Sequence, residues 1–163
     1  MTSQLLKFLS FLLGFIFFQN AFSQWLPDSA ADFHNQRGVD FIYTLQFDSA
    51  KSEFNQLIKI KPDHPGGHFF LAMVEWWKIL IDLNNKENDD NFYSLIEKVI
   101  QLCDKKLDQN SDDVTALFFK GGAIGFRGRL RVHREEWLPA ANDGRLAIPI
   151  VHQAYKLEPN NVD

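Results

Sequence analysis

The amino-acid sequence predicts an all-α fold built from about three antiparallel pairs of helices. After Gln24, apolar residues recur at three- and four-residue steps, which is the period of one face of an α-helix. No segment alternates cleanly between apolar and polar residues, and no Asn-Gly turn joins two apolar runs. Similar polar endings recur at Pro62, Asn110 and Pro159, so one structural unit is expected to occur three times.

The first pair of helices is expected over residues 30–44 and 47–60. In the second of these helices, Phe47 and Phe54 are seven residues apart and therefore lie on the same side. Pro62 is expected to end the pair, because proline has no N–H to donate and restricts the residue before it.

The second and third pairs follow the same pattern. The second pair is expected over residues 68–83 and 91–107, separated by the polar run 84–90, which is typical of a loop. The third pair is expected over residues 114–134 and 137–157. Both pairs carry apolar residues at helical spacing, and neither contains a segment that favours a strand.

The N-terminus has the pattern of a secretory signal peptide. Lys7 precedes an apolar stretch over residues 8–18, and the small-x-small ending of residues 21–23 favours cleavage after Ser23. The alternative is a retained membrane anchor, for which the stretch is short because a spanning helix needs roughly 20 apolar residues. The sequence therefore predicts an exported protein, periplasmic or extracellular, with no stable membrane span after cleavage.

Cleavage would divide the chain into a signal peptide, residues 1–23, and a helical domain, residues 24–163. It removes one lysine and no acid, so the net charge changes from −4 in the full chain to −5. A negative domain lacks the basic surface that general nucleic-acid binding needs. The only cysteine, Cys103, has no internal disulfide partner and falls on an apolar helix face, so it is expected to be a small buried side chain.

Residues 31–64 resemble a tetratricopeptide repeat, a 34-residue helix pair with small residues where the helices cross and a proline at the end. The small and aromatic positions of that family match, in register, Gly38, Phe41, Phe47, Ala50, Phe54 and Pro62. The sequence departs from the family at His34 and Arg37, which replace large apolar residues and which a terminal repeat with an exposed face could tolerate.

Residues 65–110 and 114–159 look like second and third repeats, each lengthened. In the third, Gly121 takes the position that Gly38 takes in the first, and Pro159 closes the repeat. The resemblance implies a right-handed superhelix of helix pairs, a solenoid whose concave groove binds peptides or partner proteins. Residues 158–163 are typical of the opening of another repeat, so the array is expected to continue.

Three glycines lie on one face of the helix expected from Val114, namely Gly121, Gly125 and Gly128. Each costs roughly 1 kcal/mol relative to alanine, so close helix packing is expected to offset them. The alternative, a phosphate-binding loop, lacks a preceding strand and a following Gly-Lys-Ser/Thr.

Arg127, Arg131 and Arg134 also share one helix face. One interpretation pairs them with Glu135, Glu136, Asp143 and their neighbours in a salt network. The other is a pocket in which the guanidinium groups grip a small anionic ligand.

Two further features bear on function. Trp76 and Trp77 are adjacent and point about 100° apart, so one is expected in the core while the other either anchors a partner or packs between repeats. His64 and His68 are four residues apart, but the intervening Pro-Gly-Gly is expected to prevent a helical zinc site. No catalytic constellation, metal site or cofactor site is expected, so the sequence predicts a protein that is not an enzyme.

Two hypotheses of function follow. The first is a non-catalytic exported scaffold that binds a protein or peptide partner through its groove, using aromatic and arginine side chains. The second is a periplasmic accessory protein of a transporter, in which the face formed by Arg127, Arg131 and Arg134 holds a small anionic ligand.

Overall fold

The computed structural model describes residue 26 and residues 28–159 of the 163-residue chain. This part is all-helical and contains no strand, which confirms the predicted all-α class. Six α-helices follow one another, with the bounds α2 (Ser29–Tyr43), α3 (Phe47–Ile60), α4 (Pro65–Ile81), α5 (Asp89–Leu107), α6 (Val114–His133) and α7 (Trp137–Leu157). The predicted signal peptide, residues 1–23, lies outside the described residues.

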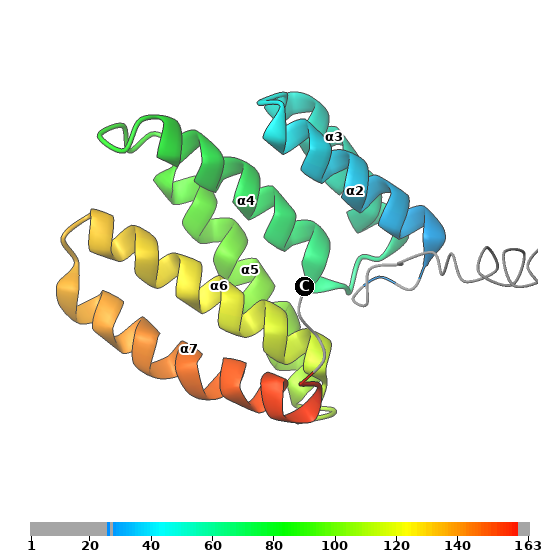
Figure 1. The fold of residues 1–163 in the computed structure, drawn as a ribbon, viewed down its shortest axis with the longest axis vertical. Helices are drawn as coiled ribbons and strands as arrows, with labels where there is room; N and C mark the ends of the chain where they lie inside the picture. The colour runs from blue at the N-terminus through cyan, green and yellow to red at the C-terminus, as the bar shows by residue number, and fades with distance from the viewer. Residues whose placement is uncertain (1–25, 27, 160–163) are drawn as a thin grey trace, which may run out of the picture.

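The helices form three pairs that lie side by side, α2–α3, α4–α5 and α6–α7 (Figure 1). Each helix packs on the next one in the chain, and the alternate helices α2, α4 and α6 also contact one another in sequence. The described helices include none long and apolar enough to cross a membrane.

The start of α4 corrects one expectation. The run Pro65-Gly66-Gly67 was predicted to lie outside the helix, but it forms its first turn and is buried. Proline suits this position because its fixed φ angle matches the helix and its missing N–H would have no intrahelical partner. The His64 side chain caps the turn, since its Nδ1 accepts a hydrogen bond from the Gly66 N–H at 3.1 Å.

The turns within the first and third pairs have the same geometry. Leu45 and Glu135 are the only non-glycine residues with positive φ among the described residues, at 58° and 62°. In each turn, the residue after the left-handed one donates its N–H at 2.8 Å to a carbonyl five residues earlier, on Phe41 and Arg131. By this correspondence Gly128, rather than Gly121, is the equivalent of Gly38.

Small residues allow the helices of each of these two pairs to approach closely. A Cβ on Gly38 would overlap the ring of Phe54, which is fully buried on α3. A Cβ on Gly128 would lie 3.0 Å from the Cβ of Asp143 on α7. Ala50, in the first turn of α3, has no exposed surface and completes the α2–α3 crossing.

Aromatic side chains connect the three pairs into one core. Phe54 of α3 stacks on Phe70 of α4 with ring centroids 5.3 Å apart. The neighbouring Phe69 meets Phe119 of α6 edge to face at the same separation. Trp76 of α4 then contacts rings of both α5 and α6. Such ring pairs add about 0.5–1.5 kcal/mol each beyond the area they bury, so aromatic packing makes a large contribution to the core.

Candidate functional site

The arginine face of α6 is occupied by carboxylates from the neighbouring helices. Arg127 binds Asp143 with two hydrogen bonds, from Nε to Oδ2 at 3.1 Å and from Nη2 to Oδ1 at 2.7 Å. Arg131 donates to the same carboxylate, from Nη1 to Oδ2 at 2.7 Å. Arg127 also pairs with Glu97 of α5, and Arg131 lies 3.7 Å from Glu136. Asp143 has no exposed surface, so this is a buried link between α6 and α7.

Arg134, at the end of α6, holds the loop between α4 and α5. Its Nε and Nη2 donate to the carboxylate of Asp89 at 2.5 and 2.8 Å. Its remaining donors reach the backbone carbonyls of Leu83 and Asn85. The guanidinium therefore joins the start of α5 to the loop before it.

Charge balance explains why these side chains remain ionised. Burial disfavours the charged form of Arg127, but the hydrogen bonds and charge of Asp143 outweigh it and raise the pKa of Arg127. The hydrogen bonds that Arg134 donates to Asp89 raise the pKa of Arg134, against the smaller effect of burial. Of the acids expected to pair with this face, Asp143 and Glu136 do so. The arrangement favours the salt-network interpretation, because the guanidinium donors already have internal acceptors.

The three glycines of α6 have different surroundings. A Cβ on Gly121 would lie 2.5 Å from Cγ2 of Val151, and Gly128 approaches Asp143, so both allow close contact with α7. A Cβ on Gly125 would have no atom within 4 Å. Gly125 was expected to pack with the other two; instead it is exposed and adjoins open space.

That open space is a surface depression of about 260 Å³ on α6, lined by Gly122, Gly125, Phe126 and Arg129. Arg129 is exposed, and its guanidinium carbon lies 5.4 Å from the ring centroid of Trp76 on α4. Phe126 packs edge to face on the same tryptophan, with centroids 5.5 Å apart. The depression thus combines an apolar floor, a bare backbone position and one accessible cation.

The adjacent tryptophans divide as the helix geometry requires. Trp76 is 3 % exposed and belongs to the core, whereas Trp77 is half-buried. Trp77 meets Tyr43 of α2 edge to face, with centroids 6.1 Å apart, and the Tyr43 side chain is largely exposed. Aromatic side chains therefore reach the surface at the α2–α4 contact as well as beside α6.

The remaining residues matched to the repeat pattern act in packing or in chain direction. Phe41 and Phe47 are partly buried against the main core, and Phe54 lies within it. Pro62 and Pro159 are exposed and directly follow the residues that cap α3 and α7. His34 and Arg37 both contact the carboxylate of Glu53 on α3, at 2.6 and 3.2 Å, so the departures from the pattern share one polar cluster.

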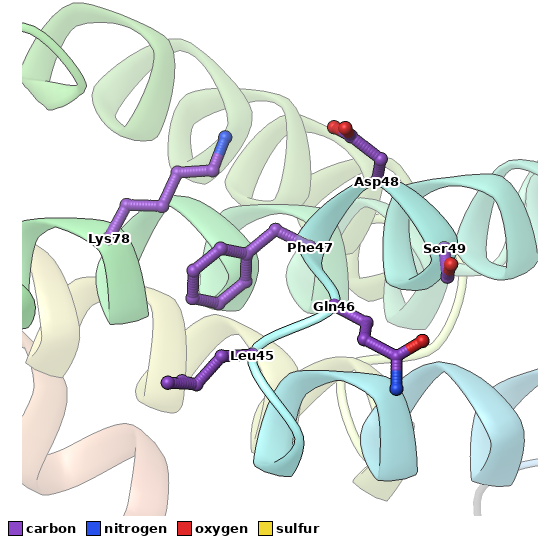
Figure 2. Close-up of a pocket in the computed structure, with 6 residues that line it drawn as sticks. All are labelled: Leu45, Gln46, Phe47, Asp48, Ser49 and Lys78. Carbon is purple, nitrogen blue, oxygen red and sulfur yellow. The ribbon is translucent and has the colours of Figure 1, made fainter.

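A second depression, of about 480 Å³, lies at the turn between α2 and α3 and is bordered by α4 (Figure 2). Its wall is formed by Leu45, Gln46, Phe47, Asp48, Ser49 and Lys78. The Lys78 ammonium of α4 lies 5.9 Å from the Phe47 ring centroid and 3.5 Å from Glu75 Oε2. Lys78 is thus engaged in holding α3 on α4.

Cys103 is buried on α5, as expected, and its pKa is raised from 9.0 to about 12, mainly by burial. Such a thiol is largely protonated at neutral pH and is a poor nucleophile. Among the described residues, no three His, Cys, Asp or Glu side chains are grouped so that they could hold a metal ion.

Comparison with known proteins adds no relative: no protein-family model matches the chain, and no curated protein matches it. The residues and their geometry are therefore the basis for assigning a function.

Proposed function

We propose that this chain is an exported, non-catalytic scaffold of the tetratricopeptide type that binds a peptide or protein partner through the surface of α2, α4 and α6. The observation that carries the proposal is the depression at Gly122, Gly125, Phe126 and Arg129. It lies on one of the alternate helices that pack on one another, where a groove of stacked helix pairs would lie.

Two features of the fold support the tetratricopeptide assignment. The turns at Leu45 and Glu135 repeat the same left-handed residue and the same hydrogen bond. Each turn follows, by seven residues, a glycine that approaches the next helix closely, Gly38 and Gly128. One helix-pair design recurring within a chain is what a repeat family with small residues at its crossings would produce.

The depression suits a side chain of a partner better than a free small anion. Its lining is mostly apolar, with a single guanidinium at the edge. Aromatic and arginine side chains are the groups that most often dominate the energetics of protein interfaces. The alternative of an anion held by Arg127, Arg131 and Arg134 has no such support, because these three arginines are paired with Asp143 and Asp89.

Gly125 provides a sharp test of this surface. Leucine at this position would fill the depression without meeting another atom within 4 Å of its Cβ. Leucine is also a better helix former than glycine, which is roughly 0.8–1 kcal/mol less favourable than alanine. Binders would first be selected from a displayed random-peptide library on the purified chain. Their affinities for Gly125→Leu and Arg129→Ala would then be measured by calorimetry.

The proposal expects Gly125→Leu to weaken binding by about tenfold or more while the fold stays intact, a loss of about 1.4 kcal/mol. The matched control is Ser94→Leu, which places the same side chain on the exposed surface of α5 and should leave binding unchanged. Equal affinity for Gly125→Leu and the original chain would rule out this surface as the binding site.

The export part of the proposal rests on the basic start and apolar stretch of the N-terminus. Expression in a Gram-negative host should yield a periplasmic or secreted product whose sequence begins at Gln24, which its mass would establish. An intact N-terminus in the cytoplasmic fraction would contradict it.

A further inference from the structure

One side of α7, next to the face that packs on α6, carries a continuous apolar stripe. Its residues follow a four-three spacing along the whole helix: Trp137, Ala141, Gly144, Ile148, Val151 and Tyr155. The large members are exposed, with 62 % of Trp137, 70 % of Ile148 and 60 % of Tyr155 accessible. At 1.5 Å per residue the stripe is about 27 Å long. Exposed apolar surface of this extent is typical of an interaction site.

The middle of the stripe is shaped for a second helix. Ala141 and Gly144 are small, and a Cβ on Gly144 would have no atom within 4 Å. Larger side chains stand on both sides of this low point. A four-three spacing is the pattern with which one helix packs lengthwise along another. The matching occupant is therefore an amphipathic helix of about 18–20 residues.

The charges beside the stripe define the chemistry of that helix. Arg145, His152 and Lys156 follow one edge of it and are exposed. Within α7 the only carboxylate is Asp143, which has no exposed surface and is bound to two arginines of α6. The exposed charged side chains of α7, Arg145 and Lys156, are thus both positive. A partner with acidic residues on the flank of its apolar stripe would be complementary.

The same charges disfavour a second copy of this chain. An antiparallel self-pair would have its midpoint near Leu146, so Arg145 of one copy would meet Arg145 of the other. A parallel self-pair would bring every basic residue opposite its own equivalent. Like charges in such positions oppose association.

We propose that α7 is a docking surface for an amphipathic helix of a partner protein, with a four-three apolar stripe and an acidic flank. This surface is separate from the depression on α6. Docking would cover the exposed rings at both ends of α7 and place the partner's carboxylates along Arg145, His152 and Lys156.

The test uses two synthetic helical peptides of about 20 residues with identical apolar stripes. One carries glutamate on the flank and the other carries lysine. The glutamate peptide should bind the full chain about tenfold or more tightly than the lysine peptide, and its binding should weaken as salt increases. Equal binding of the two peptides would overturn the proposal.

Substitutions locate the surface. Ile148→Glu should abolish binding of the glutamate peptide, whereas Ile81→Glu, at a similarly exposed isoleucine on α4, should leave it unchanged. Circular dichroism checks that both variants fold. The double variant Arg145→Glu/Lys156→Glu changes only exposed residues and should reverse the preference toward the lysine peptide. Failure of that reversal would contradict the charge argument.

Analytical ultracentrifugation of the chain alone tests whether the stripe instead binds a second copy of the chain. A monomer at all concentrations tested agrees with the proposal. Self-association that Ile148→Glu removes would mean that the stripe binds another copy, and the proposed partner would be wrong.

Discussion

Replacing Asp143 with alanine is expected to destabilise the protein by about 3 kcal/mol. The substitution removes three charge-assisted hydrogen bonds, at 3.1, 2.7 and 2.7 Å, and leaves Arg127 and Arg131 without their shared partner. Breaking a buried ion pair by removing one partner typically costs about 3–5 kcal/mol. The lower end applies because Arg127 keeps Glu97, and Arg131 is a quarter exposed and can turn toward water.

Urea denaturation followed by far-ultraviolet circular dichroism measures this loss, which corresponds to a fall of about 10 °C in Tm for a domain of this size. The matched control is Asp104→Ala, which breaks a partly exposed pair with Lys120 at 2.5 Å and should cost less than about 1 kcal/mol. A double-mutant cycle with Arg127→Ala should give a coupling energy of about 1 kcal/mol or more. Equal losses for the two aspartates would refute the reasoning that Asp143 links α6 to α7.

Three further predictions concern the glycine contacts, the reactivity of Cys103 and the pH dependence of stability. Gly38→Ala should destabilise the chain by about 1–3 kcal/mol because its Cβ overlaps the buried ring of Phe54, whereas Gly125→Ala should stabilise it by up to about 1 kcal/mol. Urea unfolding of both variants measures these changes. A change in the free energy of unfolding with the same sign for both variants would contradict the contacts. The Cys103 thiol should resist iodoacetamide at pH 8 until the chain unfolds. Burial raises the pKa of Cys103 from 9.0, and that of Tyr93 from 10.0, to about 12 in each case. Because the folded state binds these protons more tightly, their contribution to the free energy of unfolding is fully present below pH 9 and should be lost as the pH rises toward 12. Free energies of unfolding that stay level over this range would be inconsistent with that burial.

Much of the secondary structure could be predicted from the sequence because helical periodicity and proline mark it clearly. The bounds of α3 and α7 agree with those expected. The start of α4 was missed because Pro-Gly-Gly is typical of a loop. Gly67 is used instead for close packing, since a Cβ there would lie 2.5 Å from Cγ1 of Ile58. In a single sequence, glycines that form a turn cannot be distinguished from glycines that are required for close helix packing.

The register of the third pair shows a second limit. Gly121 was matched to the position of Gly38, but the turn geometry assigns that position to Gly128. The helix α6 is 20 residues long, against 15 for α2, and its additional length precedes the equivalent segment. Counting from the start of a longer helix therefore shifts the register, whereas counting back from the turn does not.

The candidate site was only partly visible in the sequence. The arginines that share a face were identified, but their partners include Asp89, which is 45 residues from Arg134. Arg129 lies off that face and was not among the predicted site residues. Its importance comes from Trp76, which belongs to another helix pair. The spacing of Gly122, Gly125 and Arg129 along one side of α6 was the available local signal.

The position of α4 between the outer pairs has a consequence for the order in which the helices unfold. Its rings contact Phe54 on one side and Phe119 and Phe126 on the other. Among the described helices, α2–α3 packs only on α4, and α6–α7 packs only on α5 and α4. Local opening of α2–α3 or of α6–α7 exposes one boundary, whereas loss of the central pair α4–α5 exposes two. Amide hydrogens of the central pair should therefore exchange with solvent last, and the ends should fray before the middle.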